Sequence, residues 1–160
     1  MTGTLAVNHV STTGSAGQVG RVIVAQIHAE DDEPIRLYYR KLPNNTRGTI
    51  YFAHEPLGRD DVYFEMIGTR SRSQPDPPDG IELNEIWSFE IRTVGNLMTV
   101  TIIREGKPDL VEVVDMSNSD FDRGGDFMYF RAGADIQDNT GDPDDSAQVT
   151  FYALDNQHGE

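Results

Sequence analysis

The sequence predicts an all-β protein, a β-sandwich of the jelly-roll type, built as one domain over residues 1–160. Three observations support this prediction. Apolar and polar residues alternate with a period of two, which is typical of half-buried strands. Turn residues interrupt the apolar segments at short intervals. No segment has the apolar stripe of period 3.6 that an amphipathic helix requires.

Gly, Pro and Asn divide the chain into strands and loops. The Gly-rich stretch 13–17 and the three prolines within 71–80 predict loops. The strongest local pattern is a pair of β-rich runs on either side of Gly95-Asn96, a dipeptide that favours a tight hairpin. The predicted strands cover residues 4–10, 21–28, 35–40, 48–54, 62–67, 86–94, 97–104, 110–115, 128–137 and 148–154.

The charge of the chain limits its partners. The net charge is −14 at pH 7, from 27 acidic and 13 basic residues. A surface this acidic repels nucleic acid and anionic membranes, and no apolar run is long enough to cross a bilayer. We therefore expect neither nucleic acid nor a membrane as partner. The chain has no cysteine, which excludes disulfides and thiolate metal sites.

Three predicted strands each carry one apolar face and one polar face of unusual composition. Because residues two apart share a face of a strand, the polar faces can be read directly from the sequence. They consist of Gln26 and His28; of Arg36, Tyr38 and Arg40; and of Tyr129, Arg131, Gly133, Asp135 and Gln137. On one sheet these faces would form a groove with local positive charge. Arg pairs with carboxylates and Tyr offers a flat polar surface, so the groove suits an anionic polysaccharide.

A plainer interpretation of the same pattern also exists. A single His on a strand is more often structural than catalytic, and alternation alone shows only a half-exposed sheet. The grouping of three such faces favours a binding groove without deciding between the two interpretations.

Several motifs resemble one known family. Gln26-Ile27-His28 matches the Gln-Ile-His motif of the alginate lyases of polysaccharide lyase family seven. The block 129–133 resembles the family's Tyr-Phe-Lys-Ala-Gly, with Gln137 at the closing Gln of that block. The stretches 17–21, 33–41 and 139–145 also resemble family sequence. The resemblance extends from Leu5 to Gly159.

The resemblance implies a jelly roll with a long groove and a lyase that cleaves polyuronates, such as alginate, by β-elimination without a cofactor. It implies that Gln26 neutralises the C5 carboxylate, so that an enolate-like charge can develop. It also implies that His28 contacts this carboxylate or acts as the general base. We expect Arg36, Arg131 and Gln137 to bind polymer, and Tyr38 or Tyr129 to supply a phenol. A secreted or periplasmic location is expected from the family, although no signal peptide is visible.

The chain departs from the family pattern in two places. The family's Arg lies in a strand upstream of the segment that residues 4–10 resemble, and the chain starts after it. The family's catalytic Tyr falls at Asp135, where a carboxylate adds negative charge and is a poor proton donor at neutral pH. Arg131 replaces the family's Lys and keeps its charge. The alternative function is therefore a non-catalytic or degenerate module that binds anionic polysaccharide.

The remaining expectations concern the sheet edge and the acidic loops. Absent first strands would leave an open sheet edge, which predicts self-association or covering by the termini. We expect Asp31-Asp32-Glu33 and the stretch 138–145 to be solvated turns. The other histidines show no metal spacing with His28, so no metal site is predicted.

Overall fold

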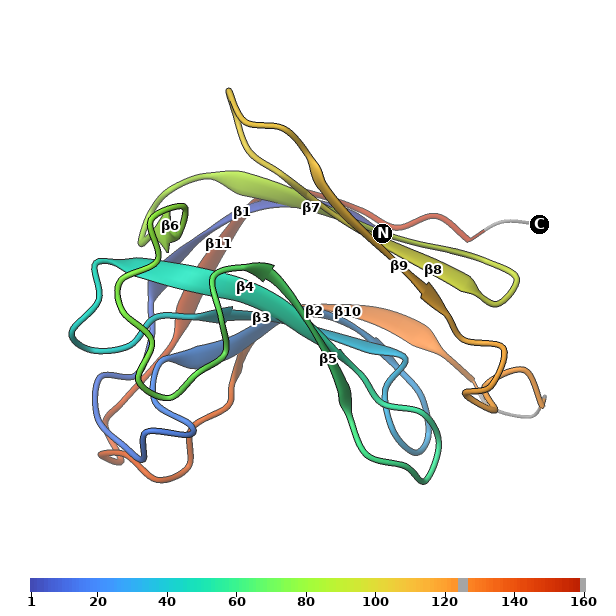
Figure 1. Ribbon diagram of the computed structural model, residues 1–160, viewed down its shortest axis with the longest axis horizontal. Coiled ribbons are helices and arrows are strands. Elements are labelled where there is room, and N and C mark those ends of the chain that lie inside the picture. The colour runs from blue at the N-terminus through green and yellow to red at the C-terminus, as the bar shows by residue number, and fades with distance from the viewer. Residues whose placement is uncertain (124–126, 159–160) are drawn as a thin grey trace.

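The structure is a computed structural model that describes residues 1–123 and 127–158 as two antiparallel sheets packed face to face (Figure 1). One sheet has the strand order β11-β1-β7-β8-β9, and the other has the order β10-β2-β3-β4-β5, with β6 paired to β4. The strands are β1 (Thr2–His9), β2 (Arg21–His28), β3 (Ile35–Arg40), β4 (Arg47–His54), β5 (Val62–Ile67), β6 (Ile81–Glu82), β7 (Trp87–Val94), β8 (Leu97–Ile103), β9 (Leu110–Asp115), β10 (Tyr129–Ile136) and β11 (Gln148–Asp155). Within the described ranges no helix has the length and apolarity that crossing a membrane requires.

The predicted all-β sandwich is confirmed. The predicted domain also includes residues 124–126 and 159–160, which lie outside the described residues. The predicted hairpin at Gly95-Asn96 is present, because Val94 pairs with Leu97 across a two-residue turn and Gly95 has φ 57°. The sequence did not predict β6, whose two residues pair with the start of β4 and are too few to show alternation.

The core fills the space between the two sheets. It is formed by the inward residues of both sheets, among which the largest fully buried side chains are Trp87, Tyr39, Phe52 and Phe89. The Tyr39 hydroxyl donates to the Ile81 carbonyl at 3.0 Å, so this buried phenol is satisfied. Burial of each such side chain contributes about 1.5–3 kcal/mol. The inward faces of β2, β3 and β4 are therefore packed in the core, and the side chains on their opposite faces are available to contact a ligand.

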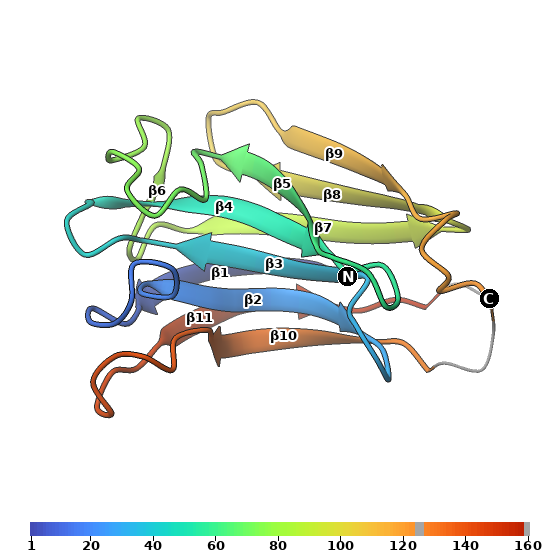
Figure 2. The same cartoon turned by 60° about the horizontal axis from the view of Figure 1, so that its bottom comes forward.

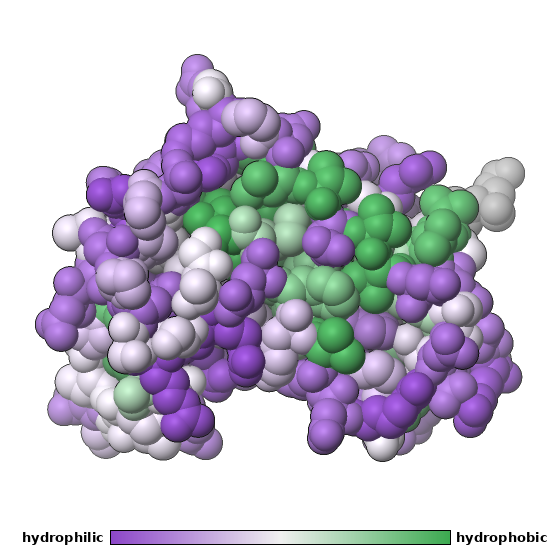
Figure 3. Space-filling view, in the orientation of Figure 1, coloured by the Kyte–Doolittle hydropathy of each residue, from purple (hydrophilic) through white to green (hydrophobic). Residues whose placement is uncertain are grey.

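The outer face of the β10-β2-β3-β4-β5 sheet forms the floor of a notch. Figure 2 shows this sheet from its outer side, and Figure 3 shows the notch at the lower edge of the molecule, between two hydrophilic walls. One wall contains the loop between β1 and β2 and the loop between β10 and β11 (Figure 1). The other contains the loop between β2 and β3 and the loop between β4 and β5. We call this notch the groove.

Candidate functional site

The strand register arranges the groove residues in rows that run across the sheet. The first row contains Asp135, Ile23, Tyr38, Tyr51 and Glu65. The second row contains Arg131, Gln26, Arg36, Ala53 and Tyr63. The third row begins with the pair Tyr129 and His28. Neighbours in a row lie about 4.8 Å apart along the hydrogen-bonding direction. The three polar faces predicted from the sequence therefore do meet on one sheet.

Two irregularities keep these rows in place. β2 has a register shift between Ile23 and Ala25, which places both Val24 and Ala25 in the core. β10 has a matching shift between Ala132 and Asp135, so Gly133 lies in the bulge and Asp135 returns to pair with Ile23. Asp135 and Arg131 consequently both belong to the groove side, as predicted.

Gln26 lies near the centre of the second row. Its residue is only 5% exposed, and its strand neighbours are Arg131 on β10 and Arg36 on β3. Among the described residues no protein group hydrogen-bonds the side-chain amide of Gln26. An amide has two N–H donors and an acceptor oxygen, so Gln26 retains its full capacity to bind a ligand.

His28 is held from two sides at the end of β2. Its Nδ1 lies 2.8 Å from Glu33 Oε1, and its ring meets the Tyr129 ring edge-on, with centroids 5.2 Å apart. The His28 side chain is 29% exposed and the Glu33 side chain 19%. The prediction that Asp31-Asp32-Glu33 is a solvated turn is therefore wrong for Glu33, whose carboxylate is bound inside the wall of the groove.

Arg36 lies in a cluster of three carboxylates. Its Nη2 lies 2.8 Å from both carboxylate oxygens of Asp61 and 3.3 Å from Glu55 Oε2, and Glu33 Oε2 is 3.8 Å from its Nε. Burial, together with the neighbouring Glu33, raises the pKa of Glu55 to about 7 against the lowering effect of Arg36. The positive charge of Arg36 is thus compensated within the protein, which its sequence position alone did not reveal.

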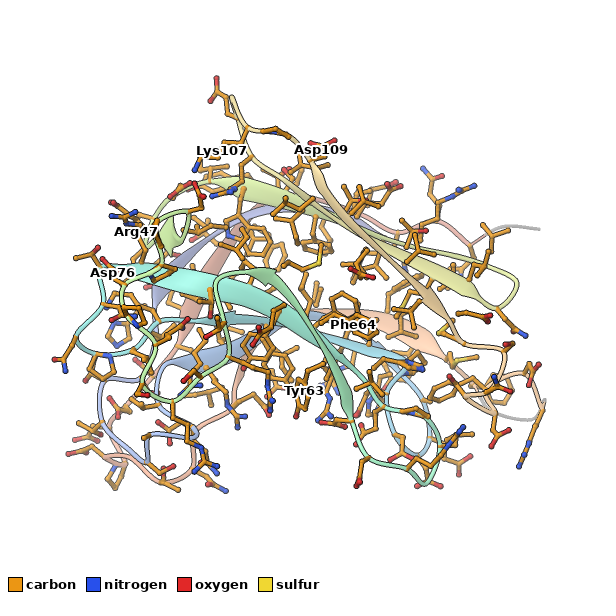
Figure 4. All side chains as sticks on the ribbon, viewed as in Figure 1. Arg47, Tyr63, Phe64, Asp76, Lys107 and Asp109 are labelled. Carbon is orange, nitrogen blue, oxygen red and sulfur yellow. The ribbon has the colours of Figure 1, made fainter. Side chains whose placement is uncertain are left out.

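Tyrosines form the apolar part of the groove floor. Tyr38 stacks on Tyr51 with ring centroids 4.8 Å apart, and Tyr63 lies beyond them on β5. In Figure 4, Tyr63 points toward the groove, whereas the adjacent Phe64 points between the sheets. Tyr38 is 3% exposed, and burial raises its pKa. Tyr38 therefore keeps its proton firmly, and its burial makes it less accessible to a ligand than Tyr129, which is 49% exposed.

Arg131 and Asp135 border a cavity between β2 and β10. The cavity has a volume of about 280 Å³ and is lined by 23–26 and 131–135. Gln137 Nε2 donates to Asp135 Oδ1 at 3.1 Å, which links two of the predicted binding residues. Arg131 is exposed and forms no ion pair with the described residues. Among the cations of the second row, Arg131 is the one whose charge is uncompensated.

The acidic stretch 138–145 is attached to the first loop of the chain. The Asp145 carboxylate accepts hydrogen bonds from the backbone and hydroxyl of Thr13, and Asp138 accepts one from the Ser11 hydroxyl at 2.8 Å. The Thr13 hydroxyl bond is the main cause of the lowered pKa of Asp145. These carboxylates fix the wall of the groove, and the described residues contain no cluster of His, Cys, Asp and Glu that could hold a metal ion.

Sequence reasoning missed part of the site. Glu33, Glu55 and Asp61 lie in loops, where strand alternation gives no information about direction. Tyr51 and Tyr63 follow the period of two, and their faces could have been assigned in the same way as that of Tyr38.

A concave sheet that carries amide, imidazole and guanidinium groups on adjacent rows of an open groove is suited to an extended polar polymer. The chain matches the family model described as alginate lyase over residues 1–158. It is 51% identical over 165 residues to an alginate lyase of Klebsiella pneumoniae, and the match covers 98% of this chain and 54% of that protein. The chain therefore belongs to the alginate lyase family.

Solved structures agree with this assignment. The crystal structure of the alginate lyase from Klebsiella pneumoniae superposes with a TM-score of 0.96 at 51% identity, over 99% of this chain and 59% of the other. The exolytic alginate lyase from Zobellia galactanivorans superposes with a TM-score of 0.74 at 27% identity, and the match covers 94% of this chain and 64% of the other. An alginate lyase from Pseudomonas aeruginosa superposes with a TM-score of 0.68 at 22% identity, and the match covers 99% of this chain and 63% of the other. This similarity supports the fold alone. The chain spans little more than half the length of its Klebsiella relatives.

Proposed function

We propose that the protein is an alginate lyase that cleaves 1,4-linked uronates by β-elimination. The observation that carries this proposal is the placement of Gln26 and His28 on the groove side of one strand, in a member of the alginate lyase family. Both groups border an open groove that crosses several strands, so a polymer can lie along it without threading.

Binding depends first on the uncompensated charge in the second row. A polymer carboxylate placed between Arg131 and Gln26 receives a charge-assisted hydrogen bond from the guanidinium and a further one from the amide N–H. Arg36 has its charge balanced by Glu33, Glu55 and Asp61, so its contribution is to hold the wall. The Asp135–Gln137 pair, next to Arg131 on β10, contacts the neighbouring sugar.

The reaction then requires a base, a proton donor and stabilisation of charge. The Nε2 atom of His28 takes the proton from C5 of the uronate, and the electron pair of that bond moves into an enolate-like state. Gln26 and Arg131 stabilise this charge by hydrogen bonds to the carboxylate. The pair then forms the C4–C5 double bond, the C4–O4 bond breaks, and O4 leaves with a proton. Tyr129 is the accessible phenol beside His28 and is the proposed donor.

The product of this reaction has a double bond that absorbs in the ultraviolet. We expect incubation with polymannuronate, polyguluronate and glucuronan to give rising absorbance with at least one of them. The same samples are measured for polymer binding by calorimetry. Binding without any absorbance at high protein concentration would reject the lyase and leave a polysaccharide-binding module, the function that Asp135 in place of the family's Tyr would favour.

A further inference from the structure

We propose that Glu33 is the positioning residue of His28, which holds the imidazole so that Nε2 faces the groove. The effect of Glu33 on kcat rests on the proposed lyase function, whereas its effect on the orientation and tautomer of His28 does not. Glu33 belongs to the loop between β2 and β3, five residues after the histidine, whereas Tyr129, which meets the ring edge-on, lies on β10.

The contact has the geometry of a charge-assisted hydrogen bond. Glu33 Oε1 lies 2.8 Å from His28 Nδ1, within the range for an N–H donor and a carboxylate. The other oxygen, Oε2, is 3.8 Å from Arg36 Nε, which is beyond hydrogen-bonding distance, and Arg36 Nε has no hydrogen-bond partner in the described residues. The carboxylate of Glu33 therefore hydrogen-bonds the imidazole, whereas its contact with the nearby guanidinium is a longer ion pair without a hydrogen bond.

The loop holds Glu33 in place through its backbone. The Glu33 N–H donates to Glu55 Oε2 at 3.2 Å, and the Glu33 carbonyl accepts from the Glu55 N–H at 3.1 Å. The next residue, Pro34, accepts a hydrogen bond at 2.8 Å from Nδ1 of the buried His54, whose other nitrogen contacts the Ser119 hydroxyl. Glu33 thus stands on a segment fixed at three points, which is the support that a precisely oriented base requires.

The pairing determines which ring nitrogen can act as a base. An ionised carboxylate only accepts hydrogen bonds, so Nδ1 of His28 carries the proton and Nε2 of the neutral ring carries the lone pair. Tyr129 covers one side of the ring and limits its rotation. When Nε2 accepts the C5 proton, the imidazolium that forms lies against the negative charge of Glu33 and is stabilised by it.

Nitrogen-15 NMR tests the structural part without any turnover. In the unaltered protein, at a pH where His28 is neutral, we expect Nε2 to show the shift of an unprotonated nitrogen and Nδ1 that of a protonated one. Glu33→Gln retains an acceptor and should keep this tautomer, whereas Glu33→Leu removes the acceptor and should give a mixture. Asp31→Asn, an exposed acid of the same loop, is the matched control and should change nothing. An Nε2-protonated ring in the unaltered protein, or an unchanged spectrum in Glu33→Leu, would overturn the proposal.

Kinetics test the consequence. Because general base catalysis contributes about 10²–10⁴-fold, we expect kcat to fall about tenfold in Glu33→Gln and about a hundredfold in Glu33→Leu, with KM changed less than about threefold. The positioning role would be rejected if KM of the Glu33 variants changed by as large a factor as kcat. It would also be rejected if their kcat values were like those of Asp31→Asn. If the unaltered protein shows the expected tautomer but no lyase activity, the proposed function fails while the Glu33–His28 pair stands.

Discussion

At the scale of single residues, Asp135 is the position at which a phenol is predicted to improve protonation of the leaving oxygen. It occupies the position where the resembling family has its catalytic Tyr, beside Arg131 in the groove. We predict that Asp135→Tyr raises kcat on alginate at least about tenfold, because a phenol hydroxyl can donate a proton to the leaving oxygen whereas a carboxylate only accepts hydrogen bonds. The rate of unsaturated product formation measures this. Asp135→Phe, which removes the charge without adding a hydroxyl, is the control, and an equal gain in that variant would show that charge alone was the defect.

Glu55 gives a residue-level prediction for the pH dependence of stability. Its pKa rises on folding from 4.5 to about 7, so the folded chain binds more protons than the unfolded chain between these values. The free energy of unfolding therefore loses a contribution as the pH rises through this window. Glu55→Gln cannot ionise, and its stability relative to the unaltered protein should increase by about 3 kcal/mol from pH 4.5 to pH 8.

Urea unfolding at a series of pH values provides this measurement. Glu30→Gln, an exposed acid on the adjacent loop, serves as control and should show a difference that does not vary with pH. A stability difference for Glu55→Gln that is flat or falls with pH would contradict the raised pKa.

The residue scale also shows where sequence reasoning stops. Gln26, His28, Arg131 and Asp135 could be placed on one surface because residues an even number apart on a strand share a face. The bulges in β2 and β10 do not remove them from the groove side. The compensation of Arg36 could not be foreseen, because it depends on loop carboxylates such as Asp61 that are distant in sequence and follow no period.

At the scale of elements, a glycine joins the first loop to β2. Gly20 has φ 73°, and a Cβ there would lie 1.9 Å from the carbonyl oxygen of Lys41. Gly58 has a similar φ of 64° but open space around it. We predict that Gly20→Ala costs about 3 kcal/mol or more of unfolding free energy, whereas Gly58→Ala costs about 1 kcal/mol, the price of a left-handed conformation alone. Equal losses in thermal or urea unfolding would contradict the role of this close approach.

The strands themselves were largely predictable, because four of them coincide with their predicted bounds and the other predicted strands differ by one or two residues at one or both ends. β1 starts earlier than predicted, at Thr2, because tertiary pairing with β7 and β11 extends it beyond its own apolar pattern. The order of strands within each sheet is set by packing between distant segments and could not be read from local patterns.

At the scale of the whole molecule, β10 and β11 form adjoining sheet edges. In the described residues neither strand has a second partner in its sheet, and exposed apolar side chains are present on both, including Ile136 and Leu154. An open edge of this kind pairs with other chains. We therefore predict a concentration-dependent dimer in sedimentation velocity experiments.

A charge at this edge should weaken that association. Ile136→Lys is expected to shift the dimerisation constant by at least about tenfold, because the charge would be buried on pairing. Val113→Lys, on the edge strand β9 of the other sheet, is the matched control. A protein that stays monomeric at all concentrations would contradict the prediction.

The proposed reaction depends on His28 as the group that removes the C5 proton. The most direct measurement is the initial rate of unsaturated product formation from alginate by the unaltered protein, His28→Ala and His9→Ala, the last being an exposed histidine on the opposite sheet. We predict that His28→Ala loses at least about a hundredfold in kcat, while His9→Ala retains full activity. Activity in His28→Ala equal to that of the unaltered protein would contradict this prediction.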